Sequence, residues 1–194
     1  MRQSSVTRRT QETDIELTLC LDGEGTADVH TGIGFFDHML SALCRFGLVD
    51  LQLTCRGDLH VDAHHTVEDV GLCLGQAIGE ALADKRGISR LGHAYVPMDE
   101  ALAFVALDSS GRPFLRVDAS VTSPMVGAMD TQLAEEFFRA VAVKAGITLH
   151  MQLPYGTNDH HKIEALFKAF GRALRDAAAI DPRVKGVPST KGVL

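Results

Sequence analysis

Short stretches of alternating apolar and polar residues predict the strands of this chain. In the first half, these stretches cover residues 5–9, 15–21, 26–30 and 51–55. Apolar residues recur at helical spacing over residues 35–46, which are followed by Gly47, and over residues 64–82. The first half therefore predicts the order β-β-β-α-β-α.

The second half repeats this order. Alternation predicts strands over residues 93–97, 102–107, 115–119 and 147–153, and helical spacing predicts helices over residues 133–145 and 160–178. This order favours an α+β fold with helices on one face of each four-stranded sheet. We expect a tandem pseudo-two-fold repeat, divided into residues 1–91 and 92–194. Residues 181–194 contain two prolines and two glycines, so we expect them to be irregular.

Each half carries one His-His-x-x-Glu motif where its last predicted helix begins. The copies are HHTVE at residues 64–68 and HHKIE at residues 160–164. His64 and Glu68 share a helix face, whereas His65 lies roughly 100° around the helix, so both imidazoles cannot easily face one ion. Clustered histidine and glutamate at two equivalent places predict a site for two metal ions. A helix start without such a role would prefer Ser, Thr or Asp.

The repeat adds one candidate ligand to each half. His38 in the first predicted helix and Glu136 before the Phe pair of the third occupy equivalent positions. Imidazole and carboxylate without nearby thiolate suit manganese, iron or zinc in a non-structural site. We expect one ion to be bound by His38, His65, His160 and Glu164. We expect the other to be bound by His64, Glu68, Glu136 and His161.

Composition narrows the classes of partner. The net charge is −6, and tryptophan is absent, which argues against a nucleic-acid partner. No apolar stretch is long enough to predict a membrane span, and the N-terminal residues lack a signal-peptide core. The cysteines form no Cys-x-x-Cys pair, so we expect buried free thiols. We therefore expect a cytoplasmic protein, to which a small anionic ligand could still bind through a few local cations.

Several side chains could together hold a phosphate group. Each of these side chains carries either a cationic group or a hydroxyl group. The residues are Arg90, Arg112, Lys168, Ser189, Thr190 and Lys191. The sequence PSTKG also offers backbone N–H groups to an oxyanion. Each cation alone is more often a solvated charge, so a phosphate clamp requires that the fold brings them together. Spacing alone gives Glu12 no role beyond that of an exposed acid.

The chain resembles a known family through the segments GFFDHML, DAHHTVEDVG, GRPFLRVD, NDHHKIEALFKAFGRAL and PSTKGVL. Together these are similar to imidazoleglycerol-phosphate dehydratases of histidine biosynthesis, over essentially the whole chain. The resemblance implies a tandem repeat of the ribosomal protein S5 domain 2-like type. It also implies two Mn²⁺ per active site at subunit interfaces, and a homo-oligomer of about 24 subunits built from trimers.

The resemblance also implies roles for individual residues. The implied metal ligands are His38, His64, His65, Glu68, His160, His161 and Glu164. The phosphate would be bound by the six cation and hydroxyl residues named above, and Glu12 would lie close to the reacting carbons. Glu136 departs from many family members, which have histidine before the Phe pair, but a carboxylate can also ligate manganese. We expect the catalytic residues to be Glu12, His64, Glu68, His160 and Glu164.

The implied reaction converts D-erythro-imidazoleglycerol phosphate to imidazole acetol phosphate. Because the proton to be removed is not next to a carbonyl, the imidazole ring must accept the charge. With two Mn²⁺ on its nitrogens, the ring would become imidazolate and expel the adjacent hydroxyl, giving a diazafulvene-like intermediate. Glu12 is the candidate base for the carbon-bound proton.

Two other classes stay open from the residues alone. A dinuclear metallohydrolase would use a bridging hydroxide and release inorganic phosphate. A metal-storage protein would bind ions without turnover, although ferritin-like bundles use Glu-x-x-His on long helices.

Overall fold

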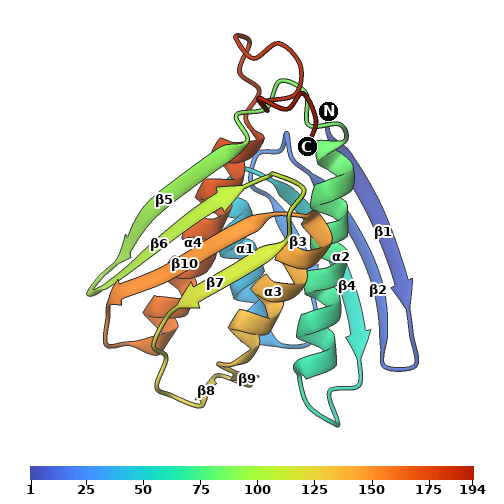
Figure 1. Ribbon diagram of the computed structural model, residues 1–194. Coiled ribbons are helices and arrows are strands. Elements are labelled where there is room, and N and C mark those ends of the chain that lie inside the picture. The colour runs from blue at the N-terminus through green and yellow to red at the C-terminus, as the bar shows by residue number, and fades with distance from the viewer.

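The first half of the chain forms a four-stranded sheet with two helices on one face (Figure 1). The computed structural model describes all residues from Met1 to Leu194. The elements of this half are β1 (Gln3–Arg9), β2 (Thr13–Cys20), β3 (Ala27–His30), α1 (Gly34–Gly47), β4 (Asp50–Gly57) and α2 (His64–Leu82). The strand order is β1-β2-β4-β3, in which only β3 and β4 are parallel.

The second half has the same topology. Its main elements are β5 (Leu91–Met98), β6 (Ala101–Asp108), β7 (Phe114–Asp118), α3 (Leu133–Ala145), β10 (Thr148–Tyr155) and α4 (Asp159–Ala178). The strand order is β5-β6-β10-β7, and only β7 and β10 are parallel. The expected α+β fold with a tandem repeat is therefore confirmed.

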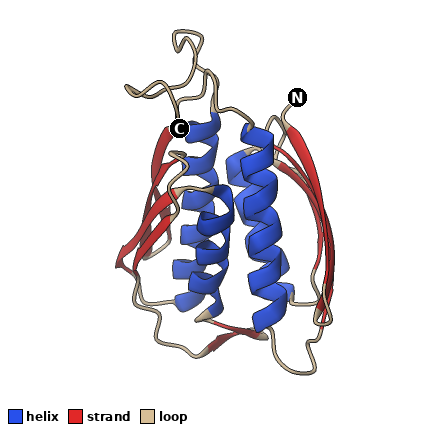
Figure 2. Cartoon of the chain, turned by 45° about the vertical axis from the view of Figure 1, so that its right-hand side comes forward, coloured by secondary structure: helices blue, strands red, loops and turns tan.

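The four helices lie between the two sheets (Figure 2). Helix α1 packs against α4, and α2 packs against α3, so each helix pair joins the two halves. One cluster of 49 buried apolar residues runs through both halves, so they do not have separate cores. The division at residue 91 stays a prediction.

The predicted strands and helices are all present. Helices α2 and α3 have the predicted bounds, and the predicted strand ends are correct to within two residues. A short hairpin before α3, β8 (Met125–Val126) with β9 (Met129–Asp130), was not predicted, because two-residue strands carry no measurable alternation. All cysteines are buried and free, as expected. None of the helices combines the length and apolar character that a membrane span requires.

Glycines let the helices of the two halves approach closely. Gly75 and Gly79 of α2 both face α3. An alanine Cβ at Gly75 would lie 2.6 Å from the carbonyl oxygen of Val141, which is closer than van der Waals contact permits. At Gly79 the nearest atom would be the Lys144 carbonyl oxygen at 3.6 Å, an ordinary contact. The two helix backbones therefore leave no room for a side chain at Gly75.

The Gly75→Ala variant is expected to lower the free energy of unfolding by about 1–3 kcal/mol, because the backbone of α3 must move. Gly79→Ala is the matched control, and it is expected to gain up to about 1 kcal/mol from the higher helix propensity of alanine. Equilibrium unfolding in urea at one fixed protein concentration measures both effects. Equal losses of stability in the two variants would contradict the close contact at Gly75.

Candidate metal centre

The second His-His-x-x-Glu motif lies at the capped start of α4. The side chain of Asn158 accepts hydrogen bonds from the backbone N–H groups of His160 and His161. Asp159 is buried, and it accepts hydrogen bonds from the Lys162 ammonium and from backbone N–H groups in the loop after β7. These contacts fix the direction in which the first turn of α4 presents its histidines.

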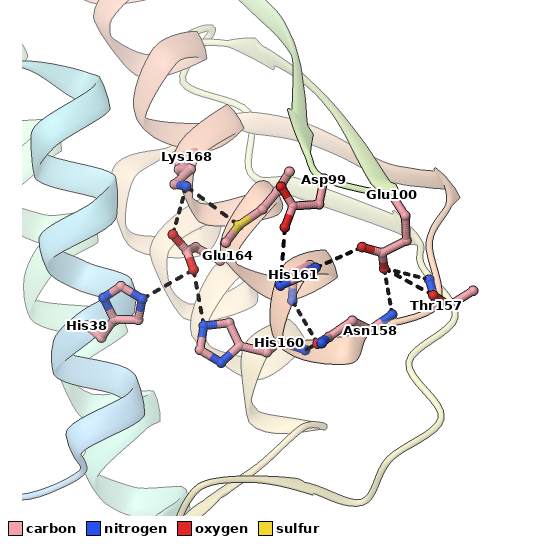
Figure 3. A network of polar contacts seen from close by, with 10 residues as sticks. His38, Asp99, Glu100, Thr157, Asn158, His160, His161, Glu164 and Lys168 are labelled. Atoms are coloured by element: carbon pink, nitrogen blue, oxygen red, sulfur yellow. Dashed lines mark hydrogen bonds and ion pairs between the residues drawn. The ribbon is translucent and has the colours of Figure 1, made fainter.

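Three potential ligands meet where α1 packs against α4 (Figure 3). His38 from α1 and His160 and Glu164 from α4 form what we call the α4 cluster, with their ligand atoms all within 4.8 Å of one another. Glu164 Oε2 lies 3.2 Å from His38 Nε2 and 3.1 Å from His160 Nε2. The carboxylate is buried while both imidazoles are partly exposed, so the cluster is open to solvent on the histidine side.

Lys168 neutralises the buried carboxylate of this cluster. Its ammonium lies 2.7 Å from Glu164 Oε1. Burial raises the pKa of Glu164, but the hydrogen bond and charge of Lys168, together with His38, outweigh burial and hold this pKa below its ordinary value. Glu164 is therefore an anion that faces two imidazole nitrogens, a ligand set that suits manganese, iron or zinc.

His161 points away from the α4 cluster (Figure 3). Its ring makes an angle of 84° with that of His160, at a centroid separation of 6.2 Å. Its Nδ1 lies 2.8 Å from Glu100 Oε2, and its Nε2 lies 3.9 Å from Asp99. The hydrogen bond with Glu100 raises the pKa of His161. The adjacent histidines face different directions, as expected from helix geometry.

The first motif shows the same divergence at the start of α2. The rings of His64 and His65 lie at 86° and 6.1 Å to each other. His64 Nε2 lies 3.9 Å from Glu68 on the next turn. His65 instead places Nδ1 3.0 Å from Asp58 and Nε2 3.7 Å from Glu12, which lies in the turn between β1 and β2. The hydrogen bond with Asp58 raises the pKa of His65.

Glu136 lies across a pocket from the first motif. This pocket has a volume of about 610 Å³, and both His64 and Glu136 line it. We call His64, Glu68 and Glu136 the α2 cluster, because they occupy the positions equivalent to the α4 cluster in the repeat. Glu136 also lies 3.7 Å from the guanidinium of Arg139. Two of the three members of the α2 cluster, Glu68 and Glu136, are carboxylates, and their like charges oppose a close approach of these two side chains.

The structure brings together only part of each expected ligand set within one chain. The ligand atoms of the α4 cluster all lie within 4.8 Å of one another. In the α2 cluster, His64 and Glu68 lie one helix turn apart, and His64 and Glu136 line the same pocket. His65 and His161, the fourth members of the two sets, face Asp58 and Glu100 instead. The complete four-residue sets therefore stay predictions.

The candidate phosphate ligands lie in two places. Arg90 donates two hydrogen bonds to Asp108, at 2.7 and 3.0 Å, and a third to the Pro188 carbonyl. Arg112 lies 3.6 Å from the same Asp108. Arg90 thus contacts the C-terminal loop of residues 188–191, which contains Ser189, Thr190 and Lys191, and Arg112 shares Asp108 with Arg90. Lys168 lies with the α4 cluster instead.

Sequence reasoning missed several polar residues around the motifs. Asp58 and Glu100 contact the diverging histidines, but nothing in their spacing indicates these contacts. Asn158 could have been found, because it lies two residues before the predicted helix over residues 160–178, and asparagine is a typical N-cap at a helix start.

The chain is similar to known proteins over its whole length. The family model described as "Imidazoleglycerol-phosphate dehydratase" matches residues 31–174. The protein of that name from Ruminiclostridium cellulolyticum is 58% identical, with 100% of both chains covered. The one from Symbiobacterium thermophilum is 61% identical, over 100% of this chain and 93% of the relative.

Solved structures give the same result. The crystal structure of imidazoleglycerol-phosphate dehydratase from Staphylococcus aureus superposes with a TM-score of 0.84 and 40% identity, over 92% of this chain and 99% of that one. The structure from Pyrococcus furiosus has a TM-score of 0.84 and 35% identity, over 97% and 100% of the two chains.

Proposed function

The chain belongs to the imidazoleglycerol-phosphate dehydratase family and is a hydro-lyase, and on this premise we propose that it acts through a site for two Mn²⁺ ions. The substrate would be D-erythro-imidazoleglycerol phosphate, and the product would be imidazole acetol phosphate, within histidine biosynthesis. The α4 cluster is the observation that carries the metal proposal, because a buried anion there faces two converging imidazole nitrogens.

The ligand chemistry of both clusters fits Mn²⁺. Their potential ligand atoms are imidazole nitrogens and carboxylate oxygens, which suit manganese in an N/O site. All four cysteines are buried elsewhere, so no thiolate is available to favour softer metal chemistry. Glu164 is already anionic, so it need not lose a proton when an ion binds.

Besides holding the two ions, the protein's own residues would perform two tasks in the reaction. When bound, the two ions would supply the Lewis-acid charge that stabilises a deprotonated imidazole ring on the substrate. Glu12, an exposed acid 3.7 Å from His65 Nε2, is the proposed base that would remove the carbon-bound proton of the substrate. Arg90, Arg112 and residues 188–191 would hold the phosphate in register. A contact of Lys168 with the phosphate stays a prediction.

We propose that each active site takes ligands from two subunits. Within one chain, His65 does not join the α4 cluster, and no contact links His161 to the α2 cluster; the two histidines contact Asp58 and Glu100 instead. One subunit would supply the α4 cluster and His161, and its neighbour would supply the α2 cluster and His65. This arrangement requires a homo-oligomer, and the family resemblance favours about 24 subunits built from trimers.

Metal removal is expected to abolish turnover, because the charge on the substrate ring then has no Lewis acid to stabilise it. Purified protein with Mn²⁺ and substrate should form the ketone product. Chelation should stop the reaction, and added Mn²⁺ should restore it. Release of inorganic phosphate would indicate a metallohydrolase instead, and Mn²⁺ binding without any product would indicate metal storage.

A further inference from the structure

Glu100 uses both of its carboxylate oxygens at the start of α4 (Figure 3). This residue lies in the tight turn between β5 and β6. Its Oε1 accepts backbone N–H hydrogen bonds from Thr157 at 3.0 Å and from Asn158 at 2.7 Å. Its Oε2 lies 2.8 Å from Nδ1 of His161. The two oxygens therefore have separate partners, and the two backbone donors fix which oxygen faces the histidine.

This arrangement determines the tautomer of His161. A carboxylate can only accept a hydrogen bond, so neutral His161 must carry its proton on Nδ1 and keep its lone pair on Nε2. We infer that Glu100 is a positioning residue that holds His161 in the tautomer able to bind a metal ion through Nε2. This inference rests on the proposed metal site and deepens it. It states that the affinity of the protein for one of the two ions depends on a residue that is not itself a ligand.

In the first half, a carboxylate also lies beside Nδ1 of the corresponding histidine, but it comes from a different part of the fold. Asp58 lies just after β4, and its two oxygens lie 3.2 and 3.0 Å from Nδ1 of His65. Glu100, by contrast, precedes β6. Because the two carboxylates come from non-equivalent places in the repeat, duplication of one ancestral contact does not explain both. Each half provides its diverging histidine with an acceptor at Nδ1.

The two carboxylates differ in one respect that allows a sharp test. No backbone N–H group donates to either side-chain oxygen of Asp58, so the amide of Asp58→Asn can turn its oxygen toward His65. The amide of Glu100→Gln cannot turn, because its oxygen must stay with the two backbone donors of residues 157 and 158. Its NH₂ group then faces Nδ1 of His161, which must accept, and the proton moves to Nε2.

Competition between the assembled protein and a Mn²⁺ chelator measures this effect directly. Glu100→Gln is expected to weaken the binding of one of the two ions by about 10–100-fold and to leave the other unchanged. Asp58→Asn is expected to stay within about 3-fold of the wild type, because its acceptor is retained. Glu80→Gln serves as the control for the loss of a carboxylate elsewhere in the protein. Glu80 accepts hydrogen bonds from Ser4 and Gln76, far from the motifs.

A second pair of variants separates positioning from a structural role of the loop. In the background of His161→Ala, adding Glu100→Gln is expected to cause no further loss of Mn²⁺ affinity, because the ligand that Glu100 positions is already gone. An additional loss would show that Glu100 acts through the loop and would overturn the inference. So would wild-type affinity of Glu100→Gln for both ions, or an equal loss in Asp58→Asn. A wild-type protein that binds no Mn²⁺ would overturn the proposed function together with the inference.

Discussion

The Glu164→Gln variant is expected to lose at least about 100-fold in turnover and to bind one Mn²⁺ fewer per chain. Glu164 is buried and contacts His38, His160 and Lys168 simultaneously. Glutamine offers a single acceptor oxygen and no charge, so Lys168 loses its counter-ion and the ion loses its anionic ligand. Turnover at saturating Mn²⁺ and the metal content of the purified protein measure the two effects.

The matched control is Glu135→Gln on α3. Glu135 also pairs with a cation four residues later, Arg139, but both side chains are about half exposed. This variant is expected to change turnover by less than about 2-fold, because exposed ion pairs contribute little. If Glu164→Gln kept wild-type turnover and metal content, the α4 cluster would not be the metal centre.

Two variants that are each expected to be inactive alone are expected to form active sites when their subunits assemble into one oligomer. Glu68→Gln alters the α2 cluster, and Glu164→Gln alters the α4 cluster. If each site joins an α4 cluster from one subunit to an α2 cluster from its neighbour, an equal mixture forms about a quarter of its sites without either substitution. Turnover of the co-refolded mixture, compared with each variant refolded alone, measures the recovery.

A pair of variants in the same cluster is the control for this experiment. Glu164→Gln and His160→Ala both alter the α4 cluster, so no arrangement of mixed subunits yields an intact site. Their mixture is expected to stay inactive. Failure of the Glu68→Gln and Glu164→Gln mixture to recover, with normal assembly, would falsify shared sites and would place all ligands of a site in one chain.

Helical periodicity explains why the placement of the two motifs at helix starts could be predicted. The spacing of apolar residues in α2 and α4 reflects which face each helix buries, and this local pattern places both motifs at helix starts. The angle between neighbouring helix positions separates His64 from His65 and His160 from His161, and both ring pairs are nearly perpendicular. These features depend only on residues that are close to one another in the chain.

The contacts of Asp58 and Glu100 could not be predicted in the same way. Glu100 reaches His161 across 61 positions, because the turn between β5 and β6 lies beside the start of α4. Its position follows from strand pairing and from the backbone donors of residues 157 and 158, neither of which leaves a periodic pattern in the sequence. The same holds for the hairpin of β8 and β9, whose strands are too short to alternate.

The sequence by itself determined the repeat, the types of the candidate ligands and the directions in which each helix turn presents them. The tertiary structure alone decided which ligands meet. His38 reaches Glu164 because α1 crosses α4 closely. The two helices approach so closely at Gly171 that the Cβ of any other residue there would lie 2.4 Å from the Leu43 carbonyl oxygen. The physical reason is that helix periodicity is a local property, whereas the meeting of two helices depends on complementary surfaces far apart in the chain.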